Sequence, residues 1–367
     1  MQNAPFETGS VSTMCGHIGF SIWRKHQHIY RRRRTYCYLE TMNTTACHMI
    51  PTVFPQTFLP PVFIFVFIVG LLANVWGLKS LLLNWKKLGN VNIFVLNLGL
   101  ADILYLLTLP FLMVYYFKGS MWIFGDVFCK VTRFCFNLNL YCSIGFLTCI
   151  SVYRYLSIVY PLRVKGRLTT THSVVITVTV WMLVGVQSLP DMFFPKTSTN
   201  VSEQCFDTTS DDHVDDYLKY SLSWTLIGFC VPSLVTLGCY GHMIAVLCYN
   251  KNIDEMLKQK SLKLLITLIL LFSVCYIPYH VLKNLNLWSR VLSRQRICPK
   301  WNNGVYIAHR ISRGLVSLNS ALNPLVYLHV DEDISAQLSR LIQRAFQSLS
   351  QLTTNTETAR LTAFRKV

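Results

Sequence analysis

The chain has 367 residues, of which 52% are hydrophobic and 14% charged, and its net charge is +17. In a soluble protein that charge would suggest nucleic acid as a partner. Mean hydropathy is +0.38, however, where soluble domains usually lie below zero. The Lys and Arg residues collect in loops beside apolar segments, as in membrane proteins, so we expect lipid and not nucleic acid around this chain.

Seven apolar segments are long enough to cross a bilayer, because a span needs roughly 20 apolar residues. Lipid offers the backbone no hydrogen-bond partners, so the spans should be helices. The fold class is predicted as all-α, a seven-transmembrane helix bundle at residues 58–328, preceded by an outer segment at 1–57 and followed by a cytoplasmic helix and tail at 329–367. The spans are expected at 58–83, 91–117, 127–158, 173–195, 217–248, 261–288 and 302–328.

Basic residues follow the first, third and fifth spans, which places those loops in the cytoplasm and the N-terminus outside, in the plasma membrane. Two sequences typical of glycosylation acceptors, at Asn43 and Asn200, fall on the same outer side. The run Arg31 to Arg34 breaks the charge rule, and a start at Met42 instead of Met1 would remove it. The basic residues that set the orientation are Lys86, Lys87, Arg163, Lys165, Arg167, Lys251, Lys258, Lys260 and Lys263.

Most of the thirteen cysteines lie within spans, where they are expected to pack as small apolar side chains. Cys129 lies at the outer end of the third span and Cys205 in the following outer loop, and Cys47 and Cys298 also lie on the outer side. Four outer cysteines suit two disulfides in an oxidising compartment, and the spacing alone leaves three pairings open.

Polar residues inside spans are candidates for function because their burial in lipid is costly. Asp102 lies in the middle of the second span, and Ser143, Asn319 and Asn323 are placed to converge on it. One carboxylate with amide and hydroxyl neighbours suits a weak Na⁺ site or, equally, a hydrated packing network. No other cofactor is expected.

Each of the last four spans contains a proline, which removes a backbone hydrogen bond and kinks the helix. Such kinks provide joints for the movement of half-helices. Arg154, at the inner end of the third span, either extends to the lipid headgroups or meets a cytoplasmic partner. The four prolines are Pro190, Pro232, Pro278 and Pro324.

Side chains spaced by four and by seven or eight residues share one face of a helix, and three such faces in the outer halves of the spans carry cations without an acid. Burying an uncompensated charge costs free energy, so an anion should bind to these faces and balance their positive charge. Four cations suit phosphate, and Tyr and His on these faces could stack on a base. Alternatively, the cations pair with Asp191, Asp207, Asp211 or Asp212 in the outer loops. The faces hold Arg133, Asn137 and Tyr141; Tyr276, His280 and Lys283; and Tyr306, Arg310, Arg313 and Ser317.

These residues together resemble the rhodopsin-like (class A) G-protein-coupled receptors over about residues 45–347. Within that family, the chain looks like the purinergic nucleotide receptors, nearest the ADP-recognising kind. The class-level motifs are Asn74, Leu98 to Asp102, Cys129, Arg154, Trp181, Pro232, Tyr240, Phe272 to Pro278, and Asn323 to Tyr327. The purinergic motifs are Trp122 to Asp126, Cys205 to Ser210, Cys239 to Gly241, Tyr276 to His280 and Ser312 to Leu315.

The resemblance implies an extracellular nucleotide, ADP or a related adenine nucleotide, as agonist. It also implies coupling through a Gq-type heterotrimeric G protein to phospholipase C and calcium. Lys283 and Arg313 would hold phosphate with Arg133 nearby, and Asp207 would pair with Arg313. His280, Asn286 and Tyr306 would line the nucleotide site. The implied disulfides are Cys129–Cys205 and Cys47–Cys298, and the implied coupling residues are Arg154, Tyr240, Phe272, Tyr276, Pro278, Asn323, Pro324 and Tyr327.

The chain departs from the family pattern at several positions. Tyr153 stands where an acidic residue usually restrains Arg154. Asn137 and Arg310 differ from the ADP-recognising relatives beside the expected ligand. The segment after the seventh span begins with acidic residues at 331–333, although apolar positions still suit a helix lying on the membrane. Those positions are Ile334, Leu338, Leu341, Ile342 and Phe346.

Other functions fit less well. A receptor for another anion, such as a uridine nucleotide, lipid acid or carboxylate, is the main alternative. A transporter or channel would need an inverted repeat or a polar stripe across the membrane, and neither is present in the sequence. An enzyme is not expected, because the sequence has no metal-ligand cluster, nucleophile–base motif or phosphate-binding glycine loop.

Overall fold

The computed structural model describes most of the predicted helical part of the chain. The described residues are 53–83, 89–164, 169–198, 204–249, 255–297, 299–326 and the short pieces 339–340, 343–344, 347–348 and 350–351. The chain divides into the units Met1–Thr44 and Thr45–Val367, and all described residues belong to the second. Several predictions lie outside the described residues: those on Arg31 to Arg34, Met42, Asn43, Cys47, Asn200, Cys298, Tyr327 and the apolar face 334–346.

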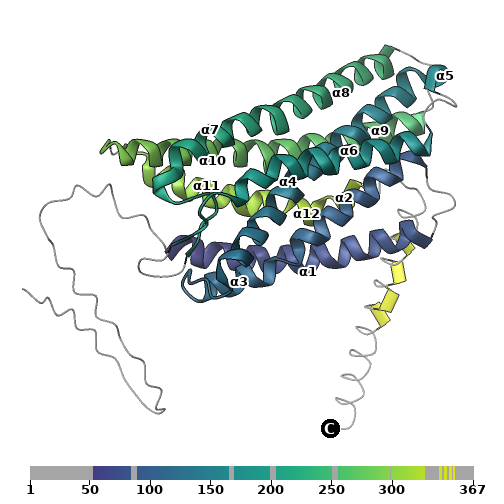
Figure 1. Ribbon diagram of the computed structural model, residues 1–367. Helices are drawn as coiled ribbons and strands as arrows, with labels where there is room; N and C mark the ends of the chain where they lie inside the picture. The colour runs from purple at the N-terminus through teal and green to yellow at the C-terminus, as the bar shows by residue number, and fades with distance from the viewer. Residues whose placement is uncertain are drawn as a thin grey trace, which may run out of the picture. The chain divides into compact units, whose positions relative to one another are not determined.

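The described residues form helices in each of the seven predicted segments (Figure 1). The first four comprise α1 (Val53–Leu83), α2 (Asn90–Leu106) with α3 (Leu109–Phe117), α4 (Gly125–Val159), and α6 (Thr170–Ser188) with the 3-10 turn η2 (Leu189–Met192). The fifth comprises η3 (Asp211–His213), α7 (Val214–Thr225), η4 (Leu226–Cys230) and α8 (Val231–Tyr249). The last two comprise α9 (Glu255–Leu270), η5 (Leu271–Tyr276) and α10 (Ile277–Arg294), then α11 (Asn302–Ser317) and α12 (Asn319–Leu322). The short helix α5 (Pro161–Val164) follows α4.

Six of the described helical segments are long and apolar enough to cross a membrane. The seventh, which comprises α11 and α12, is not among them and carries the polar residues His309, Arg310 and Arg313. Apolar side chains such as Leu72 and Leu234 are exposed on the outside of the helices, as contact with lipid requires. The all-α membrane fold is therefore confirmed, with a seventh helix that carries buried polar groups instead of a uniformly apolar surface.

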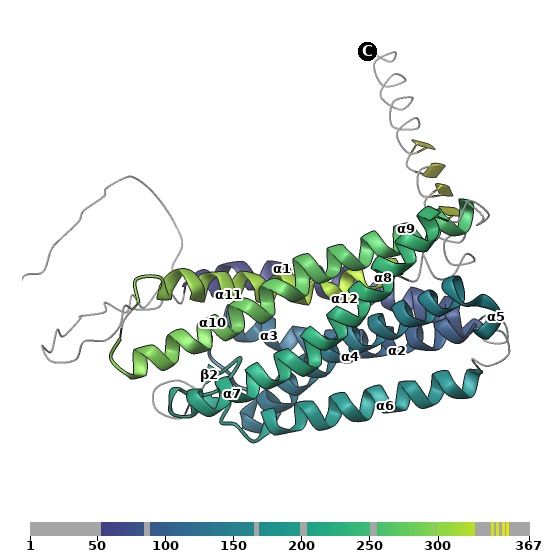
Figure 2. The same ribbon diagram turned by 90° about the horizontal axis from the view of Figure 1, so that it is seen from above.

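The third span, α4, lies at the centre of the helix arrangement. It packs against α2, α6 and α8, and Figures 1 and 2 show it crossing between them. The helix α1 packs beside α2, α3 and α11, while α10 packs between α7 and α11. Side chains on the inner face of α4 therefore meet groups from spans two, five, six and seven.

The prolines coincide with irregular turns. The π-helical turns η4 and η5 end directly before Val231-Pro232 and Ile277-Pro278. Such turns accommodate the hydrogen bond that proline cannot donate. The second span is also broken, between Leu106 and Leu109, with Pro110 in the first turn of α3. The apolar segment at 91–117 predicted this span without its break, because proline joints were expected only in spans four to seven.

Candidate functional site

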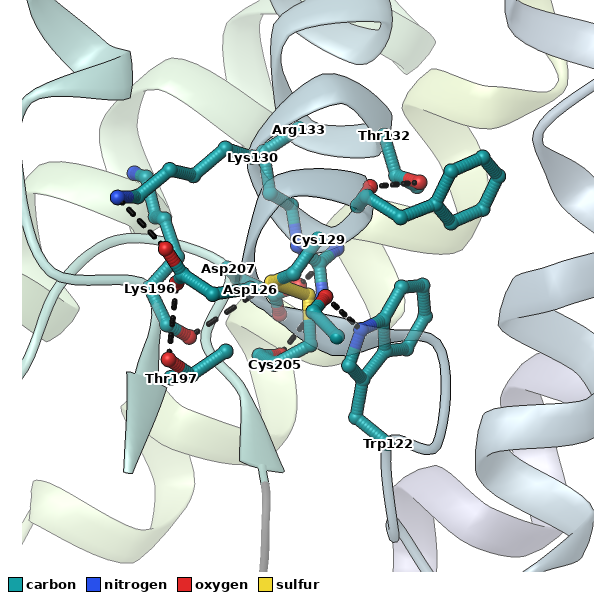
Figure 3. The surroundings of a disulfide bond; sticks show 12 residues. Trp122, Asp126, Cys129, Lys130, Thr132, Arg133, Lys196, Thr197, Cys205 and Asp207 are labelled. Carbon is teal, nitrogen blue, oxygen red and sulfur yellow. Dashed lines mark hydrogen bonds and ion pairs between the residues drawn. A yellow bond between two sulfur atoms is a disulfide. The ribbon is translucent and has the colours of Figure 1, made fainter. Parts of the chain in front are cut away.

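The outer loop after α6 is fixed to α4 by the disulfide Cys129–Cys205, which confirms that pairing. Strands β1 (Thr197–Ser198) and β2 (Gln204–Cys205) form a short antiparallel hairpin in this loop. Figure 3 shows the hairpin beside the outer end of α4, with Arg133 and Asp207 close to the disulfide. The Arg133 Nη2 atom donates to the Cys205 carbonyl at 2.8 Å. The loop is thus anchored both covalently and by a buried cation.

One carboxylate, Asp207, collects three guanidinium groups. Its Oδ1 lies 2.6 Å from Arg133 Nη1 and 3.1 Å from Arg313 Nη1, and its Oδ2 accepts from Arg310. The Asp207 and Arg313 side chains are 5% and 1% exposed, so the pairs are shielded from water. The expected Asp207–Arg313 pair is present. Asp207 reaches two further arginines as well, because the disulfide holds its loop beside the third and seventh spans.

The cluster nevertheless has more positive charge and more donors than Asp207 can satisfy. Buried Nε atoms of Arg133, Arg310 and Arg313, and Nη2 of Arg313, have no hydrogen-bond partner among the described residues. The Arg313 guanidinium also lies 4.0 Å from the centre of the Phe136 ring. An anion with several oxygens could accept from these donors together.

Lys283, on α10, is buried and has aromatic neighbours instead of an acid. Its Nζ lies 5.6 Å from the Tyr217 ring centre and 5.9 Å from that of Tyr279. Lys283 forms no ion pair or hydrogen bond with another described residue, although the charge of Asp191 acts on it from farther away. This ammonium is the cation of the predicted set that the outer-loop acids leave available.

A second buried carboxylate, Asp191 in η2, organises the other side of this region. It accepts hydrogen bonds from Lys196 Nζ at 2.8 Å, from Tyr217 OH at 2.7 Å and from Asn137 Nδ2 at 3.0 Å. Lys196 also donates to the Thr208 carbonyl. Burial lowers the pKa of Lys196, and the adjacent Asp191 charge opposes that change. Sequence reasoning missed Lys196, because a loop residue belongs to no helical stripe.

Aromatic rings and histidines line the space between these two clusters. His280 stacks on Phe229 at 4.3 Å between ring centres, and Tyr141 lies 5.8 Å from His280. His309 lies next to Tyr279, and both of its buried ring nitrogens lack a hydrogen-bond partner among the described residues. The helical period that grouped Tyr306 with Arg313 also includes position 309, so its omission from the sequence prediction was avoidable.

The predicted ligand residues therefore divide into groups. Arg133, Asp207, Arg310 and Arg313 form one contact cluster, and the Arg310 guanidinium lies 4.8 Å from the Tyr306 ring centre. Asn137 belongs to the Asp191 cluster instead. Asn286 is buried on α10, but no hydrogen bond links it to the other predicted ligand residues in the described part.

Deeper in the bundle, Asp102 accepts from Asn139 Nδ2 at 2.8 Å and from Asn323 Nδ2 at 3.0 Å on both carboxylate oxygens. Asn323 also lies 3.4 Å from Ser143 Oγ. The neighbouring Asn319 donates to Tyr276 OH at 2.9 Å. These contacts fit the packing network, since the amide donors already satisfy the carboxylate. The hydroxyl and carboxylate oxygens are also suitable Na⁺ ligands, so Na⁺ binding stays a prediction.

Asn139 was missing from the predicted Asp102 set. It lies one helical turn before Ser143, so it shares that residue's face of α4, and Ser320 Oγ donates to its amide oxygen at 3.3 Å.

At the inner end of α4, Tyr153 stands directly before Arg154 and takes part in neutral hydrogen bonds. The Tyr153 hydroxyl accepts from Asn90 Nδ2 at 3.0 Å, and the Asn90 amide oxygen accepts from Thr170 at 3.2 Å. The buried Tyr240 hydroxyl accepts from Ser151 at 3.0 Å. Tyr153 thus joins the inner ends of spans two, three and four.

Comparison with known proteins places the whole bundle in one family. Residues 73–327 match the seven-transmembrane receptor (rhodopsin family) profile. Purinoceptor 1 from mouse and from human are each 40% identical over 301 residues, covering 82% of this chain and 81% of the relative. The rat 2-oxoglutarate receptor 1 is 36% identical over 281 residues, covering 76% of this chain and 82% of the relative. The chain therefore belongs to the rhodopsin (class A) family of G-protein-coupled receptors, a family of multi-pass membrane receptors and not of enzymes, and to its purinergic group.

Proposed function

We propose that this chain is a plasma-membrane receptor for an extracellular nucleotide, ADP or a related adenine nucleotide. Its N-terminus lies outside, and it signals through a Gq-type G protein to phospholipase C and calcium. The purinoceptors among its relatives support the ligand class. The single observation that carries the proposal is the excess of buried cations at the outer end of the bundle, where Arg133, Arg310 and Arg313 share one carboxylate, Asp207, and Lys283 lies outside that pairing.

The phosphates of the nucleotide would lie between Lys283 on the sixth span and Arg313 on the seventh, with Arg133 of the third span beside them. Phosphate oxygens accept several charge-assisted hydrogen bonds at once, which the orphaned guanidinium donors require. His280, Asn286 and Tyr306 would line the nucleoside part. Tyr141 lies deeper, against His280.

Binding would draw spans three, six and seven together at their outer ends. A ligand shifts a conformational equilibrium only if it binds one state more tightly than the other. Bridging cations on three helices meets this condition, because the distances between the helices differ between states. The sixth span would pivot at Pro278, next to Phe272 and Tyr276. Arg154 and Tyr240, with Asn323, Pro324 and Tyr327 of the seventh span, would then rearrange to admit the G protein.

The test is intracellular calcium in cells expressing the chain, titrated with ADP, ATP, UDP and UTP beside untransfected cells. A response led by ADP supports receptor, ligand class and coupling together. A lack of response to all four nucleotides, with surface expression verified, would overturn the nucleotide proposal and leave the receptor family standing.

A carboxylate ligand is the second candidate, because a relative named 2-oxoglutarate receptor 1 is 36% identical to this chain. Two carboxylates could accept from the same arginines that hold Asp207. Adding 2-oxoglutarate and succinate to the titration separates the candidates. A response to a dicarboxylate with none to nucleotides would favour the second.

A further inference from the structure

Asp191 is the centre of a buried polar cluster whose geometry constrains one amide. Two donors share its Oδ1 atom, Lys196 Nζ at 2.8 Å and Tyr217 OH at 2.7 Å. The third donor, Asn137 Nδ2, uses Oδ2 at 3.0 Å. The relative exposure of Asp191 is 0% and that of Asn137 is 7%. The two carboxylate oxygens therefore have different partners.

The chemistry of these groups fixes the orientation of the Asn137 amide. An ionised carboxylate offers only acceptors, whereas an asparagine side chain has an NH₂ donor end and an oxygen acceptor end. The Lys196 ammonium, 2.8 Å from Asp191, has only donors, so it pairs with the carboxylate as an acceptor. The NH₂ end of Asn137 must then face Asp191, and the amide oxygen points to the opposite side.

Asn137 lies on a face of α4 that is buried in the interior of the bundle. Asn137 lies one turn from Arg133 and one turn from Tyr141 on α4, and the three share a face. Arg133 contacts Asp207, and Tyr141 lies next to His280. Asn137 thus lies in the wall between the cations proposed to bind phosphate and the aromatic rings.

We propose that Asp191 is a specificity-determining positioning residue. It holds the NH₂ group of Asn137, so that the amide oxygen of Asn137 faces the ligand as a hydrogen-bond acceptor. The site therefore selects a nucleotide whose base carries an exocyclic amino group. A base with only an acceptor at that position would form no hydrogen bond with the amide oxygen and would be repelled by it. This inference rests on the proposed nucleotide function and specifies the base that the site prefers.

An Asp191→Asn substitution gives a directional test. Lys196 and Tyr217 both donate to one atom, so the oxygen of the new amide must stay at the Oδ1 position. Its NH₂ group then occupies the Oδ2 position and faces Asn137. Asn137 must turn its own oxygen toward residue 191 and present its NH₂ group to the interior. The Asn137 side chain then presents a hydrogen-bond donor to the base, and the base preference of the receptor should reverse.

The probes are ADP and 6-methoxypurine riboside 5′-diphosphate, which has an acceptor but no donor at the same position. The measurement is the ratio of their half-maximal concentrations for calcium release. The unmodified receptor should favour ADP roughly tenfold, as expected for one matched hydrogen bond. Asp191→Asn should favour the methoxy analogue. Asn137→Ala keeps the Asp191–Lys196 pair and should bring the ratio close to one.

Asp211→Asn is the matched control, because Asp211 lies in the same loop, is 81% exposed and pairs with Arg290 away from Asn137. It should keep the original ratio. A general loss of stability would raise both half-maximal concentrations without reversing their order. If the Asp191→Asn receptor does not reach the cell surface, the ratio measured for Asn137→Ala tests the inference on its own.

An unchanged ratio in Asn137→Ala, or equal potency of the two probes on the unmodified receptor, overturns the inference and leaves the nucleotide proposal intact. A receptor that responds to neither probe overturns both.

Discussion

Lys283 and Arg313 differ in how firmly their charges are already engaged. Arg313 shares Asp207 with two other arginines, while Lys283 lies between the rings of Tyr217 and Tyr279. A ligand therefore meets an available ammonium at Lys283 and a partly satisfied guanidinium at Arg313. Removing the ammonium should affect binding more directly than folding, because it leaves no carboxylate without its partner.

We expect Lys283→Ala to raise the half-maximal nucleotide concentration for calcium release roughly ten- to a hundredfold, the range for a charge-assisted hydrogen bond. Surface expression should stay close to that of the unmodified chain. Lys219→Ala is the control, since that lysine is 78% exposed and pairs with Asp216 on the outside of α7. An unchanged dose response in Lys283→Ala, at equal surface expression, would rule out the phosphate role of this lysine.

Helical spacing could identify these cations but not their counter-ions. Arg133 and Arg313 are buried, as their positions within the spans predicted, and Arg310 is partly buried. Asp207 and Lys196 belong to a loop, whose path depends on the disulfide and a two-residue hairpin pairing. No sequence period encodes that path. Apart from the Asp207–Arg313 pair that the resemblance implied, the partners of the cations therefore required the structure, and so did the hydrogen bond of Asn137.

At the scale of elements, irregular turns decide how closely the helices approach. The π-helical turn η4 places Gly228 against spans three and four. A Cβ atom at Gly228 would lie 2.5 Å from Gln187 Nε2 and 2.9 Å from two atoms of the Tyr141 ring. The side chain of Gln187 can shift, but the buried Tyr141 ring has little room. Apolar periodicity predicted the fifth span at 217–248 without indicating this turn, because a π turn changes which face follows it without changing composition.

Gly228→Ala should destabilise the receptor by about 1–3 kcal/mol, the typical cost of overpacking a close contact. The measurement is thermal unfolding of the purified receptor in detergent. Gly238→Ala is the matched control on the same span, because nothing lies within 4 Å of its added Cβ. That control should be neutral or slightly stabilising. Equal unfolding temperatures for the two variants would show that the turn does not set this contact.

The joint at Pro278 makes a separate prediction about movement. Pro278 follows η5 and offers no backbone N–H, so Pro278→Ala should let the helix regularise and oppose its pivoting. We expect a lower maximal calcium response at unchanged surface expression. Pro61→Ala, in the lipid-exposed face of α1, should leave the maximum unchanged. An unchanged maximal calcium response from Pro278→Ala would mean that the sixth span pivots at another position.

For the whole molecule, the disulfide Cys129–Cys205 links the central span to the loop that supplies Asp207. The apolar segments were enough to predict the seven-helix class and the interior position of Asp102, and the family resemblance predicted this pairing. Spacing alone left three pairings open, because cysteine positions do not reveal which loops meet in space.

Replacing both Cys129 and Cys205 with Ser should destabilise the receptor by about 2–5 kcal/mol. It should also reduce surface expression and raise the half-maximal nucleotide concentration, because Asp207 and Arg133 lose their fixed register. Cys248→Ser, at an exposed free cysteine near the end of α8, should change neither. Normal expression and potency in the double variant would mean that the ionic contacts hold the loop unaided.

The position of Asp207 also makes it a tethered competitor. It lies two residues after the disulfide-bonded Cys205 and directly before Thr208, whose carbonyl accepts from Lys196 and whose hydroxyl accepts from Arg290. A group attached so closely has an effective concentration on the order of millimolar or more. An incoming monoanion would exchange one carboxylate for another with little gain, whereas a polyphosphate could reach donors that Asp207 leaves open. Under the proposed function, we therefore expect Asp207 to set a threshold that favours multivalent anions over singly charged metabolites.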